Sequence, residues 1–280
     1  MNKEILIICR GGGDLATGIV HRLFRAGYQV LILETAEPAA IRRQVSFCEA
    51  VYEGTATVEG VTAERIYTAK KQAVEEVLQR GRIPLLVDPD GRSIEVLKPD
   101  VVVDAIIAKK NLGTYKEMAP LVIGIGPGFV AGKDVHLVVE SMRGHNLARI
   151  LETGSALANT GIPGNIGGYT KERVIHAAAE GYMKNLHQIG DVVRKGEKIA
   201  RIYEQMSPEG VFSGRFVSVE ATIPGVLRGL IREGYHFQKG FKIADIDPRE
   251  SELANCFTIS DKASSIGGSV LEAVCRYVNG

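Results

Sequence analysis

The sequence predicts an α/β chain with two domains, and three observations support this fold class. A glycine-rich turn joins an apolar run to a helical pattern near the amino end. Apolar runs alternate with helical patterns through the first half, as in chains that form a mostly parallel sheet. In the second half one segment recurs at a fixed distance, which indicates a duplicated β unit. We therefore expect domains at residues 1–165 and 166–250, followed by a helical tail at 251–280.

The glycine-rich turn spans Arg10–Gly18 and follows the apolar run Ile5–Cys9. A helical pattern comes next, and a second apolar run ends at Glu34. Strand, glycine turn, helix, strand and acid follow one another in this order in a Rossmann dinucleotide-binding unit. The first domain is therefore predicted to be Rossmann-like, with a parallel sheet.

The residues of this turn have distinct roles in such a unit. Gly11 allows the sharp bend, Gly13 lets a phosphate approach the backbone, and Ala16 permits close packing of helix and strand. Glu34 could accept hydrogen bonds from a ribose, whereas Asp14 suits the helix dipole but would repel a pyrophosphate. The turn alone leaves open whether a dinucleotide is the ligand. The residues expected to contact a cofactor are Gly11, Gly12, Gly13, Asp14, Ala16, Glu34, Gly126 and Gly128.

Other loops are expected to join this site, because ligands of parallel sheets bind at the carboxyl ends of the strands. The polar loop Lys109–Asn111 and the glycine loop near Gly126 each follow an apolar run. Pro38 is expected to open a helix that carries Arg42 and Arg43. These two arginines could reach a phosphate or form a solvated helix face.

The repeat in the second half aligns Gly190–Ile202 with Gly234–Ile246, at an offset of 44 positions with 7 of 13 identical. The unit resembles the halves of biotinyl/lipoyl-type barrel-sandwich domains, which implies two interlocked β units. Such carriers attach their group to a lysine, yet no lysine lies between Lys198 and Lys239. We therefore expect a binding or docking module without a carrier lysine.

Two groups after the start of the second repeat could carry chemistry. Asp245 and Asp247 share one face of a strand and could hold a metal, or simply pair with Arg249. Cys256 could be reactive beside a helix start and Lys262, or it could be an inert buried thiol. We take Cys256, Asp261 and Lys262 as the candidate catalytic residues, and we expect no metal site.

The composition restricts the classes of partner. Hydrophobic residues make up 45% of the chain and charged residues 24%, which is typical of a globular protein. The net charge is +1, so no strong positive potential would attract nucleic acid or an anionic membrane. No apolar run reaches the roughly 20 residues of a membrane helix. The amino end leaves no room for a signal peptide. A cytoplasmic protein without nucleic-acid or membrane partners is expected.

Several motifs together carry a resemblance over nearly the whole chain. They include Gly11–Gly18, Ala40–Arg43, Gly124–Gly128, Arg143–His145, Asn159–Gly164, Gly167–Arg173, Lys242–Arg249 and Ser260–Ala263. On these motifs the chain resembles the YqeB family, the accessory proteins of selenium-dependent molybdenum hydroxylase systems. The Rossmann part also resembles xanthine dehydrogenase accessory proteins.

This resemblance implies a maturation factor whose crevice binds a nucleotide-containing ligand, either molybdenum-cofactor dinucleotide or NAD(P). Its implied partners are a molybdenum hydroxylase or the machinery that matures its cofactor. An NAD(P)-dependent oxidoreductase of a small metabolite is the alternative, although the spacing shows no obvious proton donor. A scaffold that only docks the hydroxylase is a third possibility.

Overall fold

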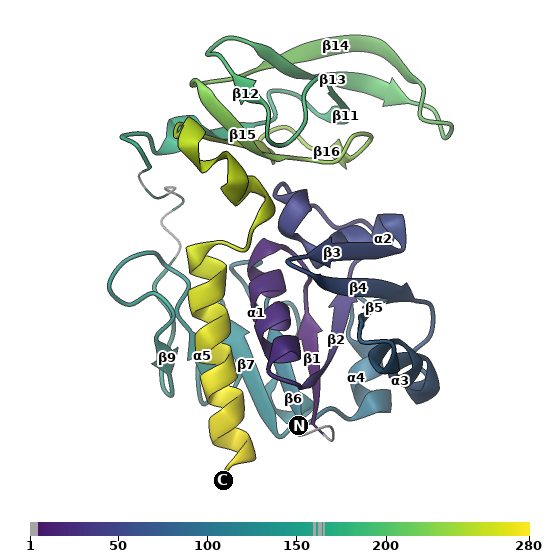
Figure 1. Cartoon of the computed structure of the whole chain (residues 1–280), viewed down its shortest axis with the longest axis vertical. Helices are drawn as coiled ribbons and strands as arrows, with labels where there is room; N and C mark the ends of the chain where they lie inside the picture. The colour runs from purple at the N-terminus through teal and green to yellow at the C-terminus, as the bar shows by residue number, and fades with distance from the viewer. Residues whose placement is uncertain (1–4, 159–160, 162–163, 165) are drawn as a thin grey trace. The chain divides into compact units, whose positions relative to one another are not determined.

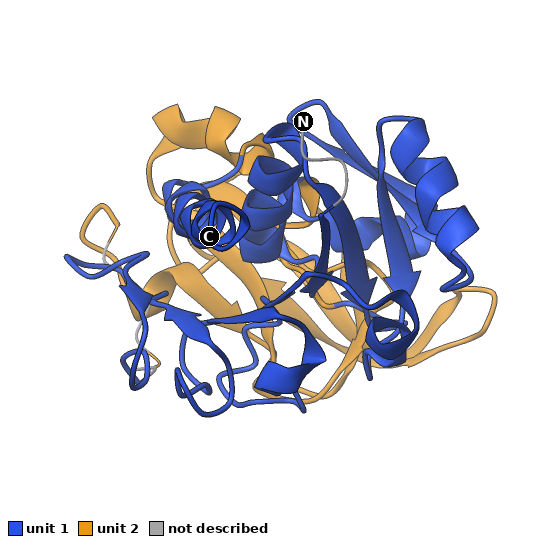
Figure 2. Ribbon diagram, turned by 90° about the horizontal axis from the view of Figure 1, so that it is seen from below, with its two compact units in different colours: residues 1–38, 45–160, 259–280 blue, residues 39–44, 161–258 orange. Residues whose placement is uncertain are grey.

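The computed structural model describes residues 5–158, 161, 164 and 166–280. The chain divides into two compact units (Figure 2). Unit 1 holds residues 1–38, 45–160 and 259–280, and unit 2 holds residues 39–44 and 161–258. The expected boundary at 165/166 thus lies five residues too late. The expected tail at 251–280 is divided between the two units, and the short segment 39–44 leaves the first half of the chain to join unit 2.

Unit 1 is built on one sheet, which has nine strands among the described residues, in the order β3-β4-β5-β2-β1-β6-β7-β8-β9. The inner strands are parallel, whereas β3 pairs with β4, and β8 with β9, in antiparallel fashion. The strands are β1 (Leu6–Arg10), β2 (Gln29–Glu34), β3 (Thr55–Val58), β4 (Val61–Ile66), β5 (Ile83–Val87), β6 (Val101–Asp104), β7 (Leu121–Ile125), β8 (Leu137–Val139) and β9 (Ile150–Leu151). The expected Rossmann-like parallel sheet is therefore wrong as stated, because the sheet is mixed.

Helices cover both faces of this sheet, which is why its inner strands are apolar at almost every position. On β1, Ile7 and Cys9 face one side with α1 (Asp14–Arg25) and α5 (Asp261–Val278). Ile8 faces the other side, with α3 (Lys71–Gln79) and α4 (Arg92–Leu97). The short α2 (Ala50–Glu53) and the 3₁₀ turns η2 (Phe47–Glu49) and η3 (Lys116–Met118) complete this unit.

Helix α5 returns from the carboxyl end of the chain to lie beside α1 (Figure 1). Its start is fixed by Ser260, whose hydroxyl accepts a hydrogen bond from the Ala263 amide at 3.1 Å. This confirms the expectation of a helix cap near Ser260. The cap places Asp261 and Lys262 in the first turn of α5.

In the described residues of unit 2 there are two four-stranded antiparallel sheets, with the strand orders β10-β17-β15-β12 and β14-β13-β11-β16. The strands are β10 (Val174–His176), β11 (Gly181–Asn185), β12 (Val192–Val193), β13 (Lys198–Met206), β14 (Phe212–Glu220), β15 (Gly225–Leu230), β16 (His236–Phe237) and β17 (Lys242–Asp247). The 3₁₀ turns η4 (Lys171–Arg173) and η5 (Glu250–Phe257) flank them.

The 44-residue repeat is visible in these two sheets. Strands β11, β12 and β13 correspond to β15, β16 and β17, and each sheet takes its strands in the same relative order. The repeats exchange their short strands, since β12 pairs with β15 and β16 pairs with β11. The duplication is thus confirmed. The expected barrel-sandwich fold is not confirmed, because the structure shows a pair of antiparallel sheets.

One glycine recurs in both repeats for a steric reason. Gly181 and Gly225 have φ angles of 151° and 144°, and a Cβ on either would collide with the carbonyl of Tyr203 or Asp247. We expect Gly181→Ala and Gly225→Ala each to lower the free energy of unfolding by about 3 kcal/mol, measured by urea titration. Gly196→Ala is the control, because its Cβ meets nothing within 4 Å. That variant should lose only the 1–2 kcal/mol or so of left-handed backbone strain. Equal losses at all three positions would contradict this explanation.

The segment 39–44 is fastened into unit 2 by main-chain and arginine contacts. Ile41 accepts a hydrogen bond from the Leu230 amide at 2.8 Å, and Arg43 Nε donates to the Leu230 carbonyl at 2.8 Å. Arg42 is 7% exposed and donates to the carbonyls of Asn255 and Thr258. The expected helix after Pro38 is absent at 39–41, and Arg42 neither lies on a solvated face nor points to a phosphate site.

Candidate functional site

The glycine turn binds the protein's own groups. The Gly12 amide donates to Glu34 Oε1 at 2.8 Å, and the Thr35 amide donates to Oε2 at 2.7 Å. On the other side of the turn, the Gly12 carbonyl accepts from the Cys48 amide at 2.9 Å and from Thr17 Oγ1 at 3.1 Å. Burial raises the pKa of Glu34, against the lowering effect of these amides. Glu34 therefore secures the turn and is not placed to hold a ribose.

The other residues expected at the cofactor site have mainly packing roles. Ala16 is buried in α1, and a Cβ on Gly11 would lie 3.0 Å from the Ala105 carbonyl oxygen. A Cβ on Gly126 would collide with the Ser141 side chain, and a Cβ on Gly128 would come within 2.8 Å of the Lys110 backbone. Of the glycines expected at this site, only Gly13 has open space where a Cβ would stand, with no atom within 4 Å. Gly13 is the residue that caps the start of α1.

Lys262 is half-buried in the first turn of α5, and the charge of Asp14, the residue after Gly13, acts on its amine. Four charged residues from three elements act on its amine: Asp14 at the start of α1, Glu140 and Arg143 after β8, and Asp261 beside it. The carboxyl ends of β1 and β8 precede Asp14 and Glu140, so the cluster lies at the edge where parallel sheets bind ligands. Burial lowers the pKa of Lys262, Asp14 raises it and Arg143 lowers it, with a net downward shift.

The carboxylates next to Lys262 are committed to other donors. The Asp261 carboxylate accepts hydrogen bonds from both terminal guanidinium nitrogens of Arg143, at 2.7 and 2.8 Å. Glu140 is buried and accepts the amides of Met142 and Leu157, at 2.7 and 2.8 Å. Within the described part of the chain, Lys262 itself forms no ion pair or hydrogen bond. A half-buried amine without a fixed acceptor is suited to meet a ligand.

Glu140 and Arg143 were not expected among the site residues. The signal that could have indicated them is their position directly after a short apolar run, since polar residues at carboxyl ends of strands gather at one edge. Asp261 and Lys262 were expected, and the structure brings both into this cluster. Cys256 belongs to unit 2 and is 1% exposed. Burial raises its pKa above the ordinary value, so the structure gives no support for a reactive thiol.

A second polar cluster, which the sequence analysis did not predict, lies at the last residues of strands β1 and β6, Arg10 and Asp104. Arg10 Nη1 lies 3.6 Å from Asp104 Oδ2, and Thr114 Oγ1 donates to the same oxygen at 2.5 Å. Arg10 also hydrogen-bonds the Pro89 and Leu112 carbonyls, at 3.1 and 3.3 Å. Because all of these partners are protein groups, this cluster fixes two loops and leaves little for a ligand.

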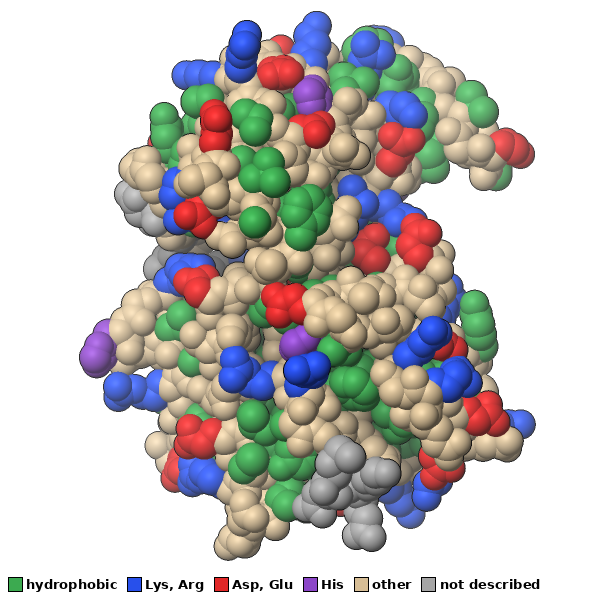
Figure 3. All heavy atoms as spheres, viewed as in Figure 1, with side chains coloured by type: hydrophobic (Ala, Val, Ile, Leu, Met, Phe, Trp, Pro, Cys, Tyr) green, Lys and Arg blue, Asp and Glu red, His purple; other side chains and the backbone are tan. Residues whose placement is uncertain are grey.

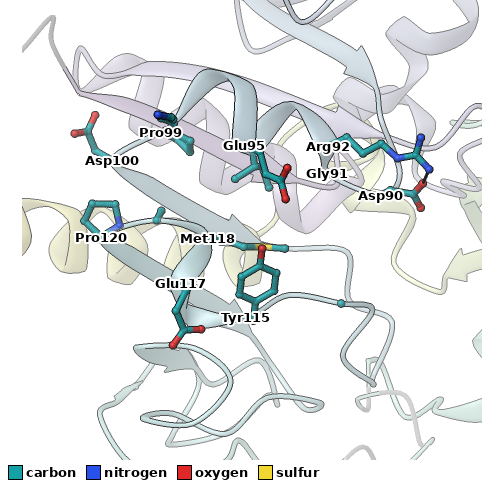
Figure 4. Close-up of a pocket in the computed structure, with 14 residues that line it drawn as sticks. Asp90, Gly91, Arg92, Glu95, Pro99, Asp100, Tyr115, Glu117, Met118 and Pro120 are labelled. Carbon is teal, nitrogen blue, oxygen red and sulfur yellow. Dashed lines mark ion pairs between the residues drawn. The ribbon is translucent and has the colours of Figure 1, made fainter.

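Unit 1 also contains a cavity of about 780 Å³ between α4 and η3 (Figure 4). It is bounded by residues directly before β6 and β7, at the amino ends of those strands, and by the loops around α4. Glu95 and Tyr115 point toward each other across it (Figure 4). Arg92 pairs with Asp90 at 3.1 Å, and Asp100 accepts the Leu6 amide at 2.9 Å. The remaining charges are of both signs, so the cavity favours no ligand charge.

The paired aspartates of unit 2 form ion pairs. Asp245 contacts Arg173 and Arg228, and Asp247 contacts Arg249. Burial tends to raise the pKa of Asp247, but the hydrogen bonds and charge of Arg249, together with the charge of Arg228, bring it below the ordinary value. Among the described residues, no group of three or more His, Cys, Asp or Glu side chains is placed to hold a metal ion.

The surface seen in Figure 3 shows acidic and basic side chains interspersed over both units. Within the portion of the chain that the structure covers, none of the helices combines the length and apolar character needed to traverse a bilayer. The expected partners, a molybdenum hydroxylase or its maturation machinery, stay predictions, as does the absence of nucleic acid and membrane among them.

Comparisons with known proteins give one strong similarity. The chain is 47% identical over 274 residues to the Escherichia coli (strain K12) protein described as uncharacterized protein YqeB. The alignment covers 98% of this chain and 48% of that protein. This chain thus spans about half the length of its relative. No family model matches the sequence.

Similarity to solved structures is weak. An aspartoacylase family protein from Mesorhizobium loti has a TM-score of 0.31 at 10% identity, covering 89% of this chain and 86% of that one. The product-bound ectoine utilization protein EutE from Ruegeria pomeroyi has a TM-score of 0.28 at 11% identity, with coverages of 87% and 85%.

The expected function is corrected on the contacts of the glycine turn. Glu34 occupies the turn that was expected to bind a molybdenum-cofactor dinucleotide or NAD(P). The maturation role and the NAD(P)-dependent oxidoreductase are therefore both withdrawn.

Proposed function

We propose that unit 1 is an enzyme domain that binds a small molecule beside Lys262. The proposal is made for this unit and not for a whole YqeB protein, because this chain matches only about half of that relative's length. The observation that carries this proposal is the half-buried Lys262 amine, which lies among Asp14, Glu140 and Arg143 without a fixed acceptor. Burial lowers the pKa of Lys262, and a lysine whose pKa is lowered can act as a general base. In this proposal Lys262 accepts or donates the proton.

The carboxylates have positioning roles in this proposal. Asp261 holds Arg143 through two hydrogen bonds, and Glu140 fixes the loop after β8 through two amides. Both side chains thus shape the site while leaving the lysine amine available. Asp14, at the positive end of the α1 dipole, is the carboxylate whose charge acts most strongly on the amine.

The first test measures the ionisation of Lys262 directly. Lysines of the full chain are reductively ¹³C-methylated and titrated by NMR, with Lys262→Arg assigning the resonance. We expect Lys262 to titrate below the ordinary lysine pKa, because burial disfavours its charged form. Lys133, which is exposed, is the internal control. A pKa for Lys262 equal to or above that of Lys133 would remove the basis of the proposal.

The second test asks whether Lys262 is held for function and not for stability. We expect Lys262→Met to leave the free energy of unfolding unchanged or to raise it by up to about 1 kcal/mol, because it removes a half-buried charge that has no ion pair. Thermal melting with a panel of small metabolites should identify ligands that stabilise the wild type and Lys133→Met, but not Lys262→Met. A marked loss of stability in Lys262→Met would instead assign the lysine a structural role.

A further inference from the structure

We propose that the cavity between α4 and η3 is a binding site for an α-amino acid with a large apolar side chain, bound as its zwitterion. This inference goes beyond the proposed function and does not involve Lys262. The cavity belongs to the sheet face where Ile94 and Ala119 are packed. Helix α5, which carries Lys262, packs through Ile266 into the core of the other face. The sheet therefore separates the two sites.

The cavity has the size of a small-molecule site, and its walls are held in place by the protein. Its volume of about 780 Å³ falls within the range of roughly 300–1,000 Å³ that such sites have. Arg10 joins the two flanking loops, because it donates to the Pro89 carbonyl at 3.1 Å and to the Leu112 carbonyl at 3.3 Å. Asp88 fixes the start of α4 by accepting the Ser93 amide at 2.8 Å. Walls fixed before binding reduce the entropy that a ligand must offset.

The buried side chains that line the cavity are apolar. Ile94 and Ala119 are 3% and 8% exposed, and Pro99 is also buried. Met118 lines the same space, is half-buried, and has a flexible thioether that adapts to irregular shapes. An apolar group that enters the cavity therefore loses contact with water and gains contact with these side chains.

The charged groups of the lining that have no protein partner are of both signs. Within the described part of the chain, the side chains of Glu95, Lys98 and Glu117 form no ion pair or hydrogen bond. Arg92 differs from them, because it pairs with Asp90 at 3.1 Å. Glu95 lies in α4 and Lys98 caps its end, so one short element carries both a carboxylate and an amine to the cavity.

This pattern selects a ligand that carries both charges. A simple anion would meet the carboxylates of Glu95 and Glu117, and a simple cation would meet the Lys98 amine. An amino acid avoids both conflicts, since its ammonium group pairs with Glu95 and its carboxylate with Lys98. Tyr115 faces Glu95 across the cavity and offers an aromatic ring to the side chain of the ligand (Figure 4).

The test measures binding of L-phenylalanine, L-leucine and L-methionine to the full chain by isothermal titration calorimetry. We expect at least one of the three to bind at millimolar concentration or below. Its amide keeps only the ammonium group and its N-acetyl derivative keeps only the carboxylate. Each derivative should bind about tenfold more weakly or worse, because it loses one charge-assisted contact. Binding of the amide as tight as that of the amino acid would overturn the zwitterion, and no binding of all three would overturn the site.

Variants place the binding in the cavity. Glu95→Gln and Lys98→Gln should each weaken binding about tenfold and leave the melting temperature unchanged, because both side chains are exposed and unpaired. Glu75→Gln is the matched control, because Glu75 pairs with Lys71 at 3.7 Å on α3 and does not line the cavity. Equal binding by Glu95→Gln and Glu75→Gln would overturn the proposal.

A further variant separates this inference from the proposed function. Lys262→Met should bind the amino acid as the wild type does, because Lys262 lies on the other face of the sheet. Loss of binding in Lys262→Met, with binding retained in Glu95→Gln, would assign the amino acid to the Lys262 site and overturn the cavity site. An ordinary pKa of Lys262 would remove the proposed function and leave the cavity site standing.

Discussion

Gly267→Val is expected to lower the free energy of unfolding by about 3 kcal/mol or more. A Cβ at Gly267 would lie 2.7 Å from the Gly18 carbonyl oxygen, and a Cβ at Gly18 would lie 2.7 Å from the Ala263 Cβ. Helices α1 and α5 therefore approach each other backbone to backbone, and a branched side chain must push them apart. Urea unfolding followed by circular dichroism measures the loss.

The next residue along α5 provides the control. A Cβ at Gly268 would meet nothing within 4 Å, so Gly268→Ala should stabilise the protein by up to about 1 kcal/mol through helix propensity. Because Lys262 lies in the first turn of the same helix, Gly267→Val should also bring the Lys262 pKa toward the ordinary lysine value. Similar stabilities for Gly267→Val and Gly268→Ala would contradict the close packing.

Asp245→Ala is expected to cost about 3–5 kcal/mol of stability, which makes it the largest effect in unit 2. Asp245 is 2% exposed and accepts hydrogen bonds from Arg173 at 3.3 Å and from Arg228 Nε at 2.9 Å. Removal of the carboxylate leaves two guanidinium groups close together, one of them buried, without this negative partner. Thermal and urea unfolding both report the loss.

An exposed ion pair serves for comparison. Asp90 pairs with Arg92 at 3.1 Å, with side chains 65% and 85% exposed. Asp90→Ala should change the free energy of unfolding by less than about 0.5 kcal/mol, because solvent already stabilises both charges. Asp245→Asn keeps the shape of the side chain and should still lose most of the stability. If Asp245→Ala and Asp90→Ala behave alike, the buried network does not hold unit 2 together.

Local patterns in the sequence predicted local features correctly. The apolar run at Ile5–Cys9 forms most of a buried strand, the turn after it bends at Gly11, and Ser260 caps α5. The 44-residue repeat predicted two equivalent sets of strands, because a repeated pattern of apolar residues and turn glycines folds into repeated structure. Each of these features depends on residues close together in the chain.

The candidate site could not be predicted from local patterns, because it is formed by segments that are far apart in the sequence. Nothing in the pattern around Glu34 distinguishes a carboxylate that binds a ribose from one that binds Gly12, because both place an acid at the end of the second strand. Lys262 reaches Asp14 only because α5 packs on α1 through glycines 249 residues apart in sequence. The family resemblance implied a ligand, and the turn it relied on is occupied by Glu34.

By itself the sequence predicted the first strand, the glycine turn after it, the repeat and the start of the last helix, but it also predicted a helix after Pro38 that is absent at 39–41. Tertiary structure alone decided that the sheet is mixed, that residues 39–44 belong to unit 2, and that Lys262 lies among charges from three elements. The physical reason is that secondary structure follows from neighbouring side chains and backbone sterics, whereas edge pairing and charge clusters depend on long-range packing.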